Sequence, residues 1–178
     1  MTKSKWPIVK LGELIEHVKS EKAGQTDYPV LSMTMKDGLV LQDERFKKKI
    51  ASKDTSAYKV VLRDQLVVGF PIDEGVLDFQ TIVDAGIVSP AYKVWRLRGF
   101  ASVDKSFLAN YLRSEFALAY YRTRLRGTTA RRRSLTDDAF LSMPVPLPPL
   151  EEQKRIAEIL SFSDSLIEKS KQAVALLN

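Results

Sequence analysis

Hydrophobic and polar residues alternate along much of the first hundred positions, as expected for β-strands with one buried face. The pattern is clearest in residues 28–35, 58–70 and 86–97, which are rich in Val, Ile and aromatic side chains. Glycines between these segments indicate turns or bulges, beginning with the Lys-Asp-Gly sequence at residues 36–38. The first hundred residues are therefore predicted to form a β core.

The hydrophobic period then changes. Apolar and aromatic residues between positions 103 and 127 recur near helical spacing. Asp104 or Ser106 is expected to cap the start of this helical region, and Gly127 is expected to stop it. A single helix and a broken pair of helices fit the pattern equally.

Four prolines, at positions 144, 146, 148 and 149, precede the last predicted helix. Proline fixes φ and lacks a backbone donor, so residues 144–148 are expected to be extended, with Pro149 in the first helical turn. Glu151 and Glu152 follow at the positive end of the helix dipole, where carboxylates are favourable. The prolines therefore predict a stiff strap that directs a helix.

The last helix carries one apolar stripe. Its apolar or small residues recur in alternating steps of four and three, the spacing of a coiled-coil seam. The seam residues are Ile156, Leu160, Ser163, Ile167, Ser170, Val174 and Leu177. Ile159, Leu166 and Ala173 lie beside the seam and widen the stripe. An isolated helix of this size needs a partner surface, so pairing with another helix and docking on its own domain both stay open.

These elements predict an α+β fold. Residues 1–143 are expected to form one globular domain with a mainly β core and accessory helices. Residues 144–178 are expected to form the proline strap and a long helix that projects from this domain and forms a coiled coil.

Composition restricts the chemistry. The chain has 178 residues, no cysteine and one histidine, which excludes disulfides, thiol catalysis and histidine-rich zinc sites. That histidine, His17, is expected on a short helix in a packing or surface role. No segment approaches the roughly 20 apolar residues that span a bilayer, and no signal-peptide core is present, so a cytoplasmic protein without a membrane partner is expected. The net charge of +6 favours a polyanionic partner.

Basic residues are densest between positions 121 and 135, on both sides of a Gly-Thr-Thr sequence. Arginine forks, hydroxyls and free loop amides suit contacts to phosphates and base edges. The predicted nucleic-acid contacts in this arginine loop are Arg126, Gly127, Thr128, Thr129, Arg131, Arg132, Arg133 and Ser134. Arg122, Arg124 and Arg126 also fit a solvated helix end, where cations are favourable anyway. Lys47, Lys48 and Lys49 form a weaker, second candidate cluster.

Signatures of catalysis are absent or incomplete. Residues 89–92 read Ser-Pro-Ala-Tyr, similar to a loop of amino-methyltransferases, but Ala91 replaces a proline and no glycine-rich cofactor loop precedes it. Four carboxylates between positions 73 and 84 could suggest a magnesium site, and they fit turns around Gly75 better. No P-loop or nucleophile-elbow motif is present. The sequence predicts a nucleic-acid reader without catalytic residues, metal or cofactor.

The whole chain resembles the specificity subunit of type I restriction-modification enzymes. The most specific motif is PLPPLEEQ, at residues 146–153, followed by an amphipathic helix. The motifs WPIVKLGELIE, YPVLSM, YKVVLRDQLVV, GIVSPAYKVWRL and RRRSL occur in the order seen in that family.

The resemblance implies that residues 1–143 are one DNA target recognition domain and residues 144–178 one conserved spacer helix with its strap. In the family, two such units in one polypeptide read the two halves of a bipartite DNA site, and their helices pair antiparallel. Methylation and restriction subunits dock on this assembly. The implied partners are therefore double-stranded DNA and both kinds of subunit, and Lys36 joins the candidate DNA contacts by its position.

This chain departs from the family pattern because it contains one unit. We expect a half-length specificity subunit, or part of a longer one, that forms a homodimer or pairs with a second recognition unit and reads a gapped inverted repeat. The expected interface comprises Ile156, Ile159, Leu160, Ser163, Leu166, Ile167, Ser170, Val174 and Leu177. Two alternatives stay open: the recognition part of a fused restriction-methylation enzyme, and a scaffold or decoy module that reads no sequence.

Overall fold

The computed structural model describes residues 5–35, 37–42, 54–99, 102–127 and 134–176. The strands are β1 (Ile8–Lys10), β2 (Ile15–His17), β3 (Leu31–Thr34), β4 (Gly38–Leu41), β5 (Lys59–Leu62), β6 (Leu66–Val68), β7 (Leu77–Phe79), β8 (Ala85–Val88), β9 (Lys93–Leu97) and β10 (Pro144–Pro146). The helices are α1 (Leu11–Leu14), the 3-10 helix η1 (Ile72–Glu74), α3 (Lys105–Leu112), α4 (Glu115–Arg124), α5 (Asp137–Leu141) and α6 (Leu150–Leu176). The predicted α+β class is confirmed.

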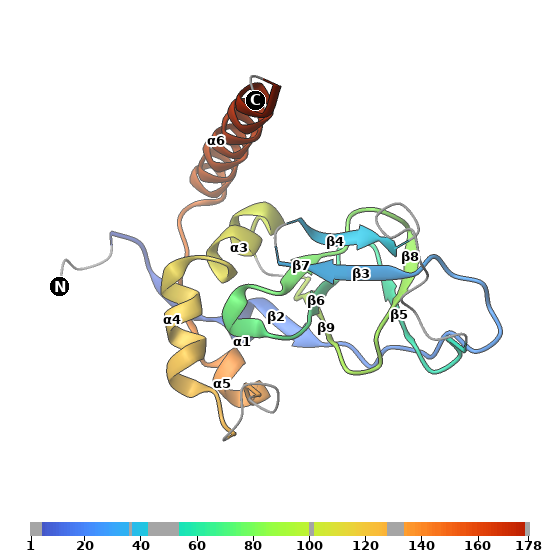
Figure 1. The fold of residues 1–178 in the computed structure, drawn as a ribbon. Helices are drawn as coiled ribbons and strands as arrows, with labels where there is room; N and C mark the ends of the chain where they lie inside the picture. Colours follow the sequence, from blue (N-terminus) through green and yellow to red (C-terminus); the bar gives the residue numbers. More distant parts are fainter. Residues whose placement is uncertain (1–4, 36, 43–53, 100–101, 128–133, 177–178) are drawn as a thin grey trace.

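A sheet in the order β2-β9-β6-β7, antiparallel throughout, forms the centre of the domain. Alternate residues of its strands enter two different clusters of buried side chains. Leu66 and Trp95 pack with the helices α3, α4 and α5, whereas Val67 and Val94 pack with the strand pairs β3-β4 and β5-β8. The sheet is therefore covered on both faces, by helices on one and by strand pairs on the other (Figure 1).

Two of the predicted strand segments are each divided by a turn. Residues 58–70 form β5 and β6, separated by a turn that contains Asp64 with φ of 70°. Residues 86–97 form most of β8 and all of β9, and the Ser-Pro-Ala-Tyr sequence is the turn between them. There the Tyr92 N–H donates to the Ser89 carbonyl (3.0 Å), and the Ala91 N–H donates to Ser89 Oγ (3.3 Å).

The predicted helical region is a broken pair, α3 and α4. Asp104, rather than Ser106, caps α3 by accepting from the Phe107 N–H (2.8 Å). Ser114 begins α4 in the same way. The predicted stop at Gly127 is wrong: α4 ends at Arg124, because Leu125 is already extended and leads into a bridge between Arg126 and Ser134.

The prediction for His17 is also wrong, because this residue lies in strand β2. Helix α1 ends at Leu14, and the next three residues pair with β9. The His17 ring meets Trp95 edge-on at 5.2 Å between centroids. The predicted packing or surface role fits this exposed histidine, which lies on a different element than predicted.

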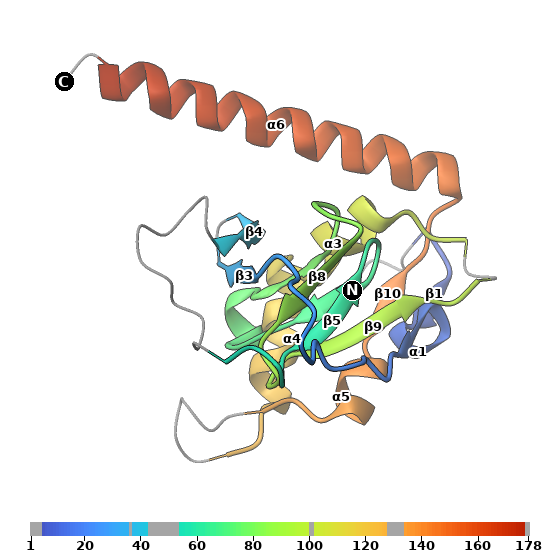
Figure 2. The same ribbon diagram turned by 90° about the vertical axis from the view of Figure 1, so that its right-hand side faces the viewer.

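The first and last strands lie side by side. β10 is extended, as the prolines predict, and pairs antiparallel with β1, with Ile8 opposite Pro146. The Tyr111 hydroxyl on α3 donates to the Pro144 carbonyl (2.6 Å). Helix α6 begins four residues after β10 and runs away from the strap over the top of the domain (Figure 2). Among the residues described, no helix combines the length and apolar character needed to cross a membrane.

Candidate nucleic-acid interface and pairing helix

The base of the predicted arginine loop is well defined. Arg126 and Ser134 exchange two backbone hydrogen bonds of 3.0 Å, which bring the ends of the loop together. Gly127 follows the bridge with φ of 121°, a conformation that favours glycine. Arg126, Gly127 and Ser134 are exposed. These side chains and backbone groups are therefore accessible to a large ligand.

Most of the other predicted DNA contacts lie outside the described residues. They are Lys36, Lys47, Lys48, Lys49, Thr128, Thr129, Arg131, Arg132 and Arg133. The contacts themselves stay predictions.

The loop is anchored where it returns to the domain. Leu135, directly after the bridge, is buried in the core with 6% of its surface exposed. Its carbonyl accepts a hydrogen bond from Lys93 Nζ (3.3 Å) on β9. The loop is thus tied to the central sheet within one residue of its base.

The two arginines that precede the loop in the last turn of α4, Arg122 and Arg124, contact residues of α4 and of η1. The Arg124 guanidinium stacks over the Tyr120 ring at 3.7 Å and donates to Thr123 Oγ1 (2.9 Å). Arg122 pairs with Glu115 (3.6 Å) and donates to the Asp73 carbonyl. The alternative of a solvated helix end therefore describes these two residues, whereas Arg126 belongs to the loop.

An aromatic pair lies beside the base of the loop. Phe70 is 49% exposed, and its ring centroid is 6.3 Å from that of Tyr92 in the β8-β9 turn. Lys59 Nζ, at the start of β5, donates to the Tyr92 carbonyl (2.6 Å). Phe70 and Ser134 line the same small pocket. Phe70 was not among the residues predicted from the sequence, although an exposed aromatic residue next to proline in a turn region is a recognisable signal.

The β3-β4 hairpin is held against β7 by Asp78. Asp78 Oδ2 accepts from the Leu39 N–H (3.4 Å), and its Oδ1 accepts from the Phe79 N–H (2.8 Å). Burial raises the pKa of Asp78, although these hydrogen bonds and the Arg113 charge act in the opposite direction. Arg113 also donates to the Met35 carbonyl (3.0 Å). The carboxylate therefore positions the hairpin.

Asp78 was predicted as a turn residue, and the structure places it within strand β7. Its neighbours Leu77 and Phe79 are buried in the helix-facing cluster, so the alternation of the strand points Asp78 to the opposite face. In the described part of the chain, no group of three or more His, Cys, Asp or Glu residues could hold a metal ion.

Helix α6 has a docked start and an exposed remainder. Ala157 is buried and Ile156 packs against the core, so the first two turns belong to the domain. Beyond them, Ile159, Ile167 and Val174 are 61%, 50% and 59% exposed. Docking on the domain is therefore observed for the start of the helix, and pairing with another helix stays a prediction for the exposed part.

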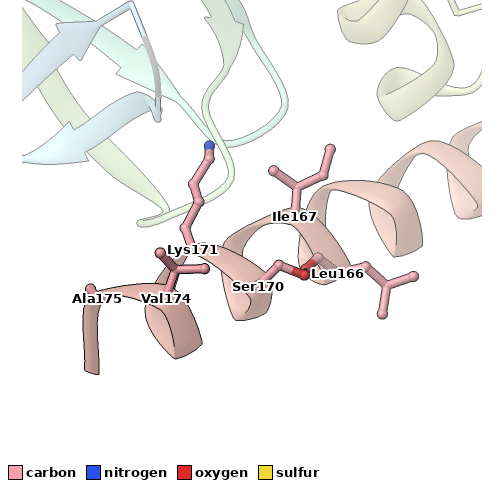
Figure 3. Close-up of a pocket in the computed structure, with 6 residues that line it drawn as sticks. All are labelled: Leu166, Ile167, Ser170, Lys171, Val174 and Ala175. Atoms are coloured by element: carbon pink, nitrogen blue, oxygen red, sulfur yellow. The ribbon is translucent and has the colours of Figure 1, made fainter. Parts of the chain in front are cut away.

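The exposed part carries a continuous apolar stripe. Figure 3 shows Leu166, Ile167 and Val174 projecting from the helix around an open hollow. Ser163 and Ser170 lie in the same stripe, and their hydroxyls donate to the carbonyls four residues earlier, both at 2.8 Å. The predicted interface residues described here are thus gathered on one helix surface; Leu177 lies outside the described residues.

Comparison with known proteins identifies the family. A family model described as the type I restriction modification DNA specificity domain matches residues 3–176. The chain belongs to this family. Specificity subunits are the non-catalytic DNA-recognition subunits of type I restriction-modification systems. The family predicted from the PLPPLEEQ motif is therefore confirmed.

Individual relatives and solved structures of the same family are also similar to this chain. The type I restriction enzyme MjaVIII specificity subunit of Methanocaldococcus jannaschii is 27% identical over 97% of this chain and 39% of its own length. The fold resembles the crystal structure of the HsdS subunit from Thermoanaerobacter tengcongensis, with a TM-score of 0.56 and 18% identity over 97% of this chain and 40% of that one. It also resembles the crystal structure of the type I restriction-modification S subunit from M. genitalium, with a TM-score of 0.57 and 15% identity over 95% of this chain and 41% of that one. The specificity-domain chain thus spans about two fifths of these relatives.

Proposed function

We propose that this specificity domain reads one half of a bipartite DNA sequence and pairs with a second recognition unit through the exposed stripe of α6. When no other unit is present, the partner is a second copy of the chain. The methylation and restriction subunits of the same system are proposed to dock on the paired assembly. The observation that carries this proposal is the apolar stripe on the part of α6 that leaves the domain.

Pairing is supported by the chemistry of the stripe. Five described apolar side chains of the stripe are between 41% and 61% exposed: Ile159, Leu160, Leu166, Ile167 and Val174. A row of this length is unfavourable in water, because each buried side chain of this size gains roughly 1.5–3 kcal/mol. A second helix with the same stripe would cover it, and a twofold arrangement presents the same surface on both copies.

DNA reading is supported by the loop that Arg126 and Ser134 close. The loop sequence is basic, its base is exposed, and the backbone bridge fixes where it leaves the domain. We propose that Arg131, Arg132 and Arg133 contact phosphates or base edges and that Thr128 and Thr129 position the backbone. Loss of one phosphate contact should weaken binding to all sequences and lower the salt slope by about 1, whereas loss of a base contact should relax specificity at one position.

The test mixes the purified chain with its cognate methylation subunit and S-adenosylmethionine and maps modified bases over random DNA. We expect a gapped inverted repeat. The double variant Ile167→Asp with Val174→Asp should abolish this pattern, because it places charges in the stripe of both copies. The matched control, Ser165→Asp with Gln172→Asp, adds the same charge on the opposite side of α6 and should leave the pattern unchanged.

Other outcomes would favour the alternatives. A stable complex with the methylation subunit but no sequence preference would replace the reader by a scaffold or decoy module. If both double variants directed modification of a single ungapped half-site equally well, DNA reading would not need pairing through α6. Either result would overturn a defined part of the proposal.

A further inference from the structure

A buried glutamine lies at the point where α6 leaves the domain. The Gln153 side chain is 0% exposed. Its Oε1 accepts from the Asp104 N–H (2.8 Å), and its Nε2 donates to the carbonyls of Ser102 (3.1 Å) and Pro148 (2.8 Å). Both N–H groups of the amide are therefore used, which is how a polar side chain is accommodated in a protein interior.

The three backbone partners of Gln153 come from two separate segments. Ser102 and Asp104 lead into α3, and the Asp104 side chain also caps that helix. Pro148 ends the strap that follows β10. One side chain thus connects the first turn of α6, the start of α3 and the end of the strap, so it restricts both tilt and rotation of α6 against the domain.

Two further contacts reinforce this joint. Trp6 Nε1 donates to Glu152 Oε2 (3.0 Å), which links the first turn of α6 to the segment before β1. Ala157, one turn after Gln153, is buried against the core that contains α3. The joint is therefore made of directional hydrogen bonds around a small packed contact. Packing alone would leave the rotation of the helix less restricted.

We propose that Gln153 sets the angle at which α6 leaves the recognition domain, and that this angle determines the gap between the two DNA half-sites. The second part rests on the proposed function. Helix α6 has 27 residues, so it is about 40 Å long at roughly 1.5 Å per residue. A tilt of about 10° at its start would move its far end by about 7 Å, which is about two base pairs at roughly 3.4 Å each. Gln153 is a positioning residue in this arrangement, because it acts through the helix.

The first arm of the test measures the joint itself. The chain has no cysteine, so single cysteines at Thr81 and Gln172, both exposed, can carry two spin labels. An excess of unlabelled chain ensures that only distances within one chain are read. We expect a narrow distance distribution for the otherwise unchanged chain and a broad one for Gln153→Met, which keeps the size of the side chain and removes its hydrogen bonds. Lys154→Met, the adjacent exposed residue, is the control and should stay narrow.

The second arm measures the DNA gap. The same variants, with the methylation subunit, are offered a library in which the half-sites are separated by gaps of every length. We expect one gap for the unchanged chain and for Lys154→Met, and at least three neighbouring gap lengths for Gln153→Met, with the same half-site sequence throughout. A residue that only stabilised the fold would lower the yield of active protein and leave the gap unchanged.

The outcomes separate the two proposals. A narrow distribution for Gln153→Met, or a broad one for the unchanged chain, would overturn the role of Gln153 in the joint whatever the DNA result. A broad distribution with one gap would overturn the link to DNA spacing. No gapped repeat for the unchanged chain would overturn the proposed function, while the distance arm still decides the joint. If Gln153→Met does not fold, Gln153→Asn replaces it, because an amide that is one methylene shorter cannot reach all three backbone partners at once.

Discussion

At the scale of single residues, Gly38 shows how closely the β3-β4 hairpin fits against β7. Its φ is 66°, and a Cβ atom at this position would lie 1.9 Å from Asp78 Oδ2. Gly24 has a similar φ of 59°, yet a Cβ atom there would meet nothing within 4 Å. The two glycines therefore share a backbone conformation and differ in what surrounds them.

This difference gives a paired prediction. Gly24→Ala should lower the free energy of unfolding by about 1–2 kcal/mol, because a left-handed backbone is unfavourable for residues with a Cβ. Gly38→Ala should cost about 1–3 kcal/mol more, because the new methyl group must displace the Asp78 carboxylate from the Leu39 N–H. Urea denaturation of both variants measures the difference. Equal losses would show that the hairpin can move away from β7 without penalty.

Asp78 should also make stability depend on pH. Burial raises the pKa of Asp78 above its ordinary value of 3.8, so the folded chain holds this proton more tightly than the unfolded chain. Between the ordinary and the raised pKa the folded state binds more protons, and the free energy of unfolding therefore falls as the pH rises through that window.

The variant Asp78→Asn has no carboxyl group to titrate. Relative to this variant, the unchanged chain should lose stability as the pH rises from the ordinary pKa of an aspartate through the raised pKa of Asp78, and the difference should become constant once the carboxyl is fully ionised. Urea midpoints at several pH values measure it. The stability difference between the two proteins could instead stay constant over the whole pH range, or the unchanged chain could become relatively more stable as the pH rises. Either result would contradict the effect of burial on the pKa of Asp78.

At the scale of elements, the serines in the α6 stripe affect how another helix can approach. The hydroxyls of Ser163 and Ser170 already donate to carbonyls of their own helix, so neither hydroxyl needs a partner from across an interface. Small residues in a seam allow two helices to come close together.

We therefore expect Ser163→Ala with Ser170→Ala to pair at least as tightly as the unchanged chain. Replacing both serines by leucine should instead change the spacing of the helices, because the new side chains occupy the room that the serines leave. Sedimentation equilibrium over a range of concentrations measures the dimer dissociation constant. A tenfold weaker dimer in the alanine variant would mean that the hydroxyls contribute directly to pairing.

The elements also show how far sequence patterns predict structure. The break between α3 and α4 was left open, because apolar spacing continues through Ser114 and only its cap to Ala117 divides the helices. The helix expected at His17 is a strand, because pairing with β9 outweighs local preference. In contrast, the prolines of β10 and the stripe of α6 were predicted correctly, since fixed φ angles and a long helical period depend little on distant residues.

At the scale of the whole molecule, the first strand depends on a segment made near the end of the chain. β1 has β10 as its pairing partner among the described residues, and Val145 of β10 is fully buried. A chain ending at residue 143 lacks this strand, whereas a chain ending at residue 160 retains it together with Gln153 and Ala157. We expect the longer fragment to unfold cooperatively and the shorter one to lack a cooperative transition.

Circular dichroism during heating compares the two fragments. A cooperative transition in the shorter fragment would place the edge of the folding unit at residue 143, and pairing with β10 would then contribute little to the domain. The sequence pointed to that position because the prolines begin there. Pairing between residues 8–10 and 144–146 cannot be read from local periodicity, and neither can the three contacts of Gln153.

The pairing of β1 with β10 also limits when the first strand can find its partner during synthesis. About 130 residues must be made after β1 before its partner strand exists, which takes roughly 7 to 25 seconds at about 5–20 residues per second. Throughout that interval the first strand has a free edge, and Tyr111 lacks the carbonyl of Pro144. Helix α6 is translated directly after β10, so its exposed apolar stripe is made only after the last strand of the domain.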